Sequence, residues 1–260
     1  MEKIKIEKKA TQLKRLLLFS SIIALVSFSI TQINVSWNNF FERLPNLPIV
    51  FNRFLSIDYA AIPEILNGML ISLALSFLGL FFGVCLSFML SFLAAQNISP
   101  NKLLSRLIKS IVAIIRGIPS LVWGIILVAS IGFGNETGLI VVGLSAVGFL
   151  TKAFVTTIEE TGEEIIEAMS ATGASWIGVV IHGLLPIVIT GFISSLIVQY
   201  ERGVALSISL GIIGITGVGL ELRQAMMTYN YARITTIVLV IFIVMFLLEL
   251  ATNKSKAIFK

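Results

Sequence analysis

The chain has 260 residues, of which 57% are hydrophobic and 13% are charged, and its mean hydropathy is +0.98. Soluble domains carry roughly a quarter charged residues, so this composition predicts a membrane protein. One cysteine, one histidine and the lack of any Gly-Lys dipeptide exclude a disulfide framework, the common zinc motifs and the phosphate-binding loop of ATPases, so we expect no catalytic site, no metal and no cofactor in this chain.

The first predicted membrane span covers residues 16–33 and follows Lys14, Arg15 and four further lysines. Signal peptides and retained anchors both have this pattern. The apolar run is long and no small-residue cleavage pattern follows it, which favours an anchor. Residues 34–65 carry three prolines and several charges. We therefore assign residues 1–65 to an anchor helix followed by an external loop.

The second and third predicted spans are separated by a basic break. Residues 66–95 form a run of thirty residues without a charge, about 45 Å long as a helix, so this span must tilt, bend or project. Residues 97–109 contain three cations and apolar residues at helical spacing, which predicts a short helix at the membrane surface. The third span, 111–133, contains Pro119 and is expected to kink there.

Three more spans are predicted in the second half of the chain. They cover residues 139–158, 184–200 and 234–248, and a polar insertion at 159–183 precedes the second of them. Residues 203–220 have five glycines and no charge, so they form either a further helix or a re-entrant segment. A basic tail, 252–260, ends the chain.

The distribution of Lys and Arg predicts the orientation. With six spans, the segments assigned to the cytoplasm hold twelve Lys or Arg and the outer loops hold five, so both termini are expected inside. A full seventh span over residues 203–220 would move the tail outside, which favours a partly inserted segment. This asymmetry accounts for the net charge of +5 without nucleic acid.

The insertion at 159–183 predicts a short cytoplasmic helix. Glutamates at 163–167 suit its first turn, where the helix dipole favours negative charge. Ala168 and Ala171 share one face, and Gly173 is expected to cap the C-terminus. Pro186 is expected in the first turn of the next span. The small face would leave room for another protein to approach closely.

This segment resembles the EAA loop of ABC importer permeases, which has the pattern E-A-x-x-x-x-G, nine residues, then x-x-L-P. The pattern is met by Glu167, Ala168, Gly173, Leu185 and Pro186. In that family the loop is a coupling helix that docks into a separate ATPase subunit, so the resemblance implies a coupling role for these residues and Ala171. Gly183 departs from the usual loop, which has an aliphatic residue there.

Other segments are similar to the phosphonate-type members of the family. Residues 93–97, L-A-A-Q-N, stand where those permeases have L-A-A-R-N, and residues 116–123 resemble R-S-I-P-E-L-V-W. Residues 211–222 resemble G-L-V-G-A-G-G-I-G-x-x-L. The resemblance covers residues 66–251. It implies a type I importer permease domain of the MetI-like fold, within which residues 159–186 form the coupling loop.

The resemblance implies an all-α, multi-pass subunit of a prokaryotic plasma membrane. A second permease, either another copy or a relative, would complete the pathway. A pair of ATPase subunits would bind ATP and Mg²⁺, and an extracytoplasmic protein would deliver the cargo. The subfamily implies phosphonate or a related oxyanion, while a thiamine-like or other small nutrient remains an alternative. The glycines Gly211, Gly214, Gly217 and Gly219 either line a gate or pack closely against a neighbour.

Two hypotheses compete with the importer. A self-sufficient secondary transporter would show repeated halves and charges near the membrane midplane. Neither is evident, since Arg116 and Lys152 are placed near the cytoplasmic ends of their spans, where long side chains reach the interface. A membrane-embedded enzyme would need convergent catalytic groups, and Cys85 and His182 supply few.

Overall fold

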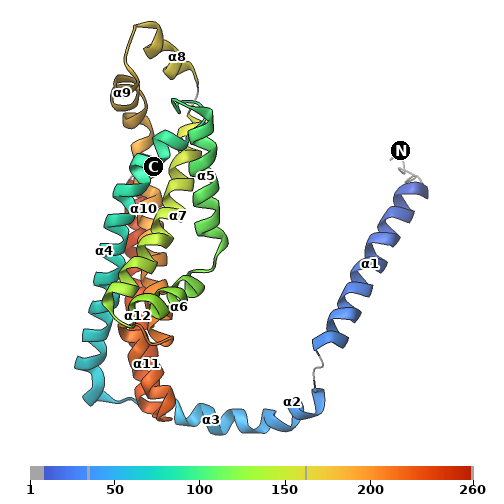
Figure 1. The fold of residues 1–260 in the computed structure, drawn as a ribbon. Helices are drawn as coiled ribbons and strands as arrows, with labels where there is room; N and C mark the ends of the chain where they lie inside the picture. The colour runs from blue at the N-terminus through green and yellow to red at the C-terminus, as the bar shows by residue number, and fades with distance from the viewer. Residues whose placement is uncertain (1–8, 34–35, 162, 259–260) are drawn as a thin grey trace, which may run out of the picture. The chain divides into compact units, whose positions relative to one another are not determined.

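A computed structural model describes residues 9–33, 36–161 and 163–258 (Figure 1). Within these ranges every element of regular secondary structure is a helix, which confirms the all-α prediction. Five helices are long and apolar enough to cross a membrane, and one bent pair raises the count to six. Lys3, Lys5, Lys8 and Lys260, used above to predict the orientation, lie outside the described residues.

The chain divides into two units, Met1–Asn52 and Arg53–Lys260. The first unit contains α1 (Lys9–Ile33), α2 (Trp37–Arg43), a 3₁₀ turn (Leu44–Asn46) and most of α3 (Leu47–Arg53). Most of the predicted external loop over residues 34–65 is therefore helical, and its place outside the membrane stays a prediction. Pro45 and Pro48 fall in the first turns of their helices, where an N–H has no intrahelical partner and its loss costs little.

The second unit is built around α4 (Ile62–Ala94) and α7 (Asn135–Glu160), which share the most extensive contact in the fold. Glycines at the contact let the two helices approach closely. A Cβ added at Gly79 would lie 2.6 Å from Val142 Cγ1, and one added at Gly83 would overlap the Ala146 methyl. This is the close packing of small residues that membrane helices use.

The third span is a broken helix. α5 (Lys102–Gly117) and α6 (Ser120–Ile131) meet at an angle of 88° on either side of Pro119, so the predicted kink is confirmed. The Trp123 indole N–H donates to the Ile115 carbonyl at 3.1 Å and bridges the break. The predicted surface helix over residues 97–109 is wrong, because the helix runs unbroken from Lys102 to Gly117 and packs on α7 and α4.

The fifth span is much longer than the prediction of residues 184–200. Helix runs without interruption from Trp176 to Ile212 through α9 (Trp176–Gly178), a π-helical turn (Val179–Leu184) and α10 (Leu185–Ile212). Residues 203–212 therefore belong to this span, and the separate inserted segment over 203–220 is a wrong prediction. Glu201 and Arg202 do not end the helix, and the exposed Arg202 places its guanidinium 4.5 Å from the centre of the Phe149 ring.

Two helices complete the unit, α11 (Val218–Met227) and α12 (Tyr231–Ile258). An aromatic core joins α4, α7 and α10 towards the end of the bundle that carries α8 (Figure 1). Phe154 and Phe192 stack with ring centres 3.9 Å apart, and Phe92 packs beside them. Burying each such ring contributes roughly 2–3 kcal/mol to the free energy of folding, so this core stabilises the end of the bundle that carries α8.

Candidate functional site

The predicted cytoplasmic helix is present as α8 (Glu163–Ala171), which projects beyond the tips of α5 and α7 (Figure 1). Glu163 and Glu164 lie in its first turn, as expected from the helix dipole. The helix is short, so its stability must come from its termini and from its contact with the bundle.

Gly173 ends this helix as predicted. Its φ is +79°, in the left-handed region that favours glycine. Its N–H donates to the Ser170 carbonyl at 3.0 Å, and the Ala174 N–H donates to the Met169 carbonyl at 3.3 Å. These two bonds form a Schellman motif, which satisfies the last carbonyls and turns the chain back to the bundle.

The two faces of α8 differ in size and exposure. Ile166 and Met169 are half-buried and pack against the aromatic core. Ala168 and Ala171 are exposed on another face, together with Glu167. The structure therefore presents a face of small side chains outward, as predicted.

Gly183, which departs from the usual loop, has a local explanation. A Cβ at this position would lie 3.2 Å from Met169 Cγ, tighter than ordinary packing. An aliphatic side chain would push α8 away from the π-helical turn beneath it. The glycine thus allows α8 to lie close to the start of the fifth span.

Leu185 and Pro186 form the first turn of α10, but they do not begin the helix. The helix already runs from Trp176, and the π-helical turn immediately precedes them. Proline has no N–H for the residue four positions back, and a π-helical turn relaxes that requirement. Leu185 packs against the core, whereas Pro186 is exposed.

Hydrogen bonds attach the α4–α5 loop, residues 95–101, to both ends of the segment that carries α8, residues 159–186. On the near side the Gln96 N–H and Lys109 Nζ both donate to Glu159 Oε1, at 2.8 and 2.7 Å. The Asn97 amide donates to the Ile158 carbonyl at 2.9 Å. The Lys109–Glu159 pair is about one-third exposed and contributes at most about 1 kcal/mol.

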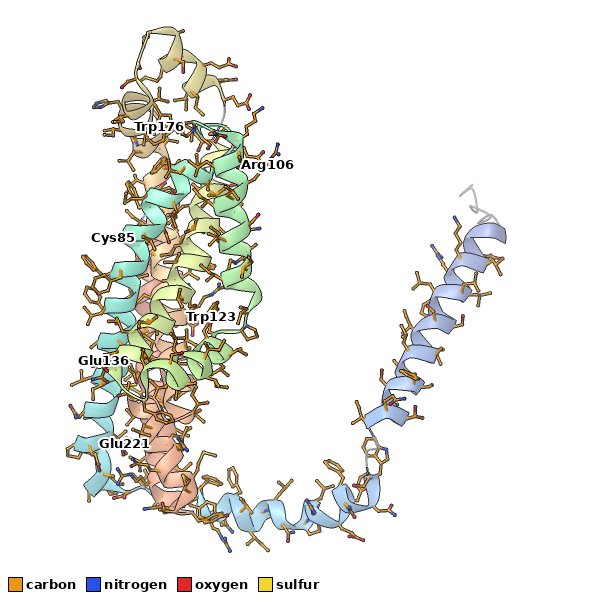
Figure 2. The ribbon with its side chains drawn as sticks, viewed as in Figure 1. Cys85, Arg106, Trp123, Glu136, Trp176 and Glu221 are labelled. Atoms are coloured by element: carbon orange, nitrogen blue, oxygen red, sulfur yellow. The ribbon has the colours of Figure 1, made fainter. Side chains whose placement is uncertain are left out.

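On the far side, the Trp176 indole N–H donates to the Ile98 carbonyl at 2.8 Å. Figure 2 shows Trp176 at the base of the projecting segment, beside the tip of the bundle. Sequence reasoning missed this contact and Glu159, because both join residues more than sixty positions apart. The only signal was the L-A-A-Q-N segment, which contains Gln96 and Asn97.

The four glycines predicted as a gate or close packing lie at the opposite end of the bundle from α8 (Figure 1). Gly214 and Gly217 have φ of +99° and +82° and form the turn between α10 and α11. A Cβ on Gly211 would lie 2.6 Å from Gly219 Cα, and one on Gly219 would overlap the Ile208 carbonyl. The two helices therefore meet backbone against backbone.

A buried serine and an ion cluster hold this turn. Ser72 Oγ accepts the Val218 N–H at 3.1 Å, and the Ser72 carbonyl accepts the Ser207 hydroxyl at 3.1 Å. Arg233 pairs with Glu64 at 2.6 Å and with Glu221 at 2.5 Å, which joins α12, α4 and α11. Figure 2 shows Glu221 at this end of the bundle. The sequence analysis assigned no role to these charges.

Comparisons with known proteins agree on one family. Residues 87–259 match the model of the binding-protein-dependent transport system inner membrane component. The chain is 30% identical over 217 residues to the phosphite transport system permease protein PtxC of Stutzerimonas stutzeri, covering 84% of this chain and 79% of that protein. It is 29% identical over 167 residues to the phosphate-import permease protein PhnE of Mycolicibacterium smegmatis, covering 64% and 31% respectively.

A solved structure has the same fold. A chain of the MetNI methionine ABC transporter, in an inward-facing conformation, superposes with a TM-score of 0.70 at 21% identity. The match covers 78% of this chain and 100% of that one.

Proposed function

Because the chain belongs to the binding-protein-dependent transport system inner membrane component family, we propose that α8 couples it to a separate ATPase and that its cargo is an oxyanion of the phosphite, phosphate or phosphonate class. The chain is a membrane-spanning permease subunit of an ABC importer, and it lies in the prokaryotic plasma membrane as a multi-pass protein. What is proposed concerns its contacts, its partners and its cargo.

The observation that carries the coupling proposal is the outward face of α8. Ala168 and Ala171 are exposed side chains on a helix that projects beyond the bundle, and small side chains allow close docking. Glu167, Gly173, Leu185 and Pro186 shape the same segment. Docking of an ATPase here would move α8 together with the α4–α5 loop, because hydrogen bonds join the two.

In this proposal the ATPase pair binds ATP and Mg²⁺, and this chain binds neither. ATP binding closes the pair and displaces α8, which biases the permease between two conformations, as alternating access requires. A second permease chain, either another copy or a relative, completes the pathway. An extracytoplasmic binding protein delivers the cargo. The support for an oxyanion cargo is the similarity to permeases of phosphite and phosphate import.

A size series at Ala168 tests the coupling face. Ala168→Phe should abolish binding-protein-dependent phosphite uptake into proteoliposomes, because the larger side chain separates α8 from the ATPase. Ala168→Ser, the matched control, keeps the small size and should transport normally. Co-purification of the ATPase with the tagged chain should fall only for the phenylalanine variant. Normal uptake by Ala168→Phe would contradict the proposed coupling role of this face.

A further inference from the structure

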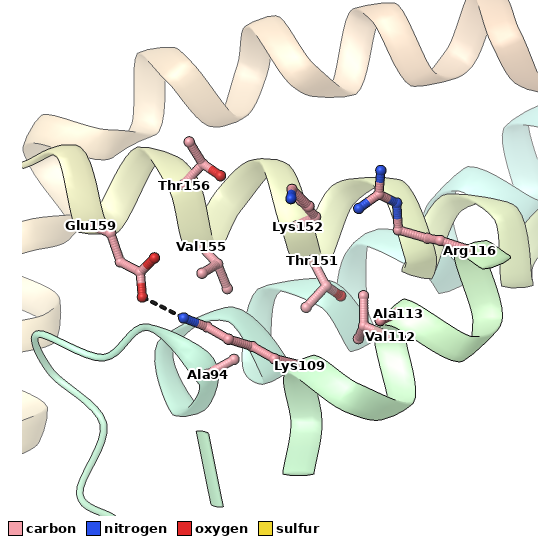
Figure 3. Close-up of a pocket in the computed structure, with 10 residues that line it drawn as sticks. All are labelled: Ala94, Lys109, Val112, Ala113, Arg116, Thr151, Lys152, Val155, Thr156 and Glu159. Atoms are coloured by element: carbon pink, nitrogen blue, oxygen red, sulfur yellow. Dashed lines mark hydrogen bonds and ion pairs between the residues drawn. The ribbon is translucent and has the colours of Figure 1, made fainter. Parts of the chain in front are cut away.

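A cavity of about 200 Å³ lies between α5 and α7, and no residue of α8 lines it (Figure 3). Three cations line it together with one carboxylate: Lys109, Arg116, Lys152 and Glu159. A cavity needs about 10–15 Å³ of such space to hold one water, so this one has room for a small polyatomic ion and several waters.

The positive charges of these three cations are not equally neutralised by neighbouring carboxylates. Lys109 is paired with Glu159, whose same oxygen also accepts the Gln96 N–H. Arg116 and Lys152 make neither an ion pair nor a hydrogen bond within the described residues. Figure 3 shows the Arg116 guanidinium turned along α7 towards Lys152. Two cations therefore converge without a counter-charge.

These two cations lie further from α8 along the bundle than the Lys109–Glu159 pair does. Lys109 and Glu159 meet near the end of α7, which finishes at Glu160. Arg116 is two turns further along α5 and Lys152 two turns back along α7, each about 10 Å deeper. Both side chains are exposed on the chain, and a cation that faces lipid within a membrane span is unfavourable. This face therefore needs water or an anion.

The fold makes room for one of these cations. Gly148 is buried, and a Cβ added there would lie 2.8 Å from Arg116 Cγ. The glycine thus leaves the space through which the Arg116 side chain passes over α7. A larger residue would force the guanidinium away from Lys152.

A buried hydroxyl provides an independent observation. Thr151 lines the cavity, is only 1% exposed, and its Oγ1 has no hydrogen-bond partner within the described residues. A buried polar group without a partner is costly, and an unseen water or ion is one of the arrangements that satisfies such a group. A hydroxyl beside two cations is a donor set suited to anionic oxygens.

We propose that this cavity binds a tetrahedral oxyanion, held by Arg116 and Lys152 with the Thr151 hydroxyl as an additional donor. Arg forms paired hydrogen bonds to phosphate-like oxygens and Lys supplies a point charge, which together select charge and geometry. The same chemistry belongs to a free phosphate-class ion and to the headgroup of an anionic lipid. Only the identification of the ion as cargo rests on the proposed function.

Binding is tested on the full chain in nanodiscs of phosphatidylcholine, with radiolabelled inorganic phosphate and without ATP. Arg116→Gln and Lys152→Gln should each weaken phosphate binding by at least about tenfold, the usual effect of losing a hydrogen bond to a charged group. Thr151→Val keeps the shape of the side chain and should weaken binding a few-fold while leaving thermal stability unchanged or higher. A hydroxyl with only a structural role would give the opposite stability result.

Arg106→Gln is the matched control, because it removes the same charge from the same helix at an exposed position outside this cavity. The lipid source is tested in nanodiscs containing phosphatidylglycerol, with retained lipid measured by native mass spectrometry. Phosphate binding lost in the two variants assigns a free ion, and lipid retention lost in them assigns a headgroup. If Arg116→Gln does not fold, the proposal is tested with Lys152→Gln and Thr151→Val alone.

The proposal is overturned where neither probe responds to Arg116→Gln or Lys152→Gln more than to Arg106→Gln. This result is independent of coupling, since no ATPase is present. Conversely, normal uptake by Ala168→Phe would contradict the coupling proposal. The phosphate-binding result would stand, because that assay does not depend on coupling.

Discussion

Single residues determine how closely the helices of this permease approach, and the glycines between α10 and α11 have the strictest requirement. Gly219 faces the Ile208 carbonyl and Gly211 faces the Gly219 backbone, so neither position has room for a methyl group. A gating role and a packing role for these glycines predict different effects of the same substitution. A gate lining would alter transport at normal stability, whereas close packing would alter stability itself.

We expect Gly219→Ala to destabilise the protein by about 1–3 kcal/mol, because a new Cβ overpacks against backbone that has no alternative position. Gly143→Ala is the control: a Cβ there meets its nearest atom, the Gly79 carbonyl oxygen, at 3.7 Å, an ordinary contact in mid-helix. The measurement is thermal unfolding of the purified chain in detergent. Equal stability of the two variants would contradict packing and favour a gate.

Some residue-level features were predictable because they depend on local chemistry. The Gly173 cap follows from a helix that ends in small residues before a turn, and the structure confirms it with a positive φ and two capping bonds. The start of the third span was predicted less well, since it was set at residue 111 whereas α5 begins at Lys102.

At the scale of elements, the segment that carries α8 depends on the α4–α5 loop as well as on its own sequence. α8 has nine residues, too few for a stable isolated helix. The loop ties its near side through Glu159 and its far side through Trp176. The order of this segment is therefore a tertiary property.

Trp176→Phe tests this dependence, since it keeps an aromatic ring and removes the N–H that bonds to Ile98. The lost bond contributes about 1 kcal/mol, so we expect faster amide hydrogen exchange in residues 95–101 and 172–178 with little change in global stability. Trp123→Phe, which loses the bond to Ile115, should instead speed exchange at the α5–α6 bend. Identical exchange patterns in the two variants would show that neither bond acts locally.

The predicted boundaries of the helices are wrong where the fold does not follow a local signal in the sequence. Residues 201 and 202 form a Glu-Arg pair, which normally marks a membrane interface. Here the helix continues to Ile212, and the exposed Arg202 contacts the Phe149 ring of α7. Residues 34–65 are more helical than expected for another reason, since prolines that suggest irregular backbone instead stand in the first turns of short helices.

At the scale of the whole second unit, one continuous helix connects the two ends of the bundle. It runs from Trp176 to Ile212, a length of about 55 Å at the usual rise. Its first residue is bonded to the α4–α5 loop below α8, and its last turn packs on α11 through Gly211. In the proposed mechanism, a displacement of α8 would be transmitted along this helix to the far turn, as alternating access requires.

The orientation of this helix remains a prediction, and the coupling proposal requires α8 to face the cytoplasm. Cys85 is exposed, so labelling begins from a Cys85→Ala background. Ser170→Cys on α8 and Tyr229→Cys after α11 place single thiols at exposed positions at opposite ends of the bundle. In intact cells a membrane-impermeant maleimide should label only the thiol at 229, and permeabilised cells should label both, because ATP is hydrolysed on the cytoplasmic side. Labelling at 170 in intact cells would invert the topology, and an ATPase would then have no access to α8.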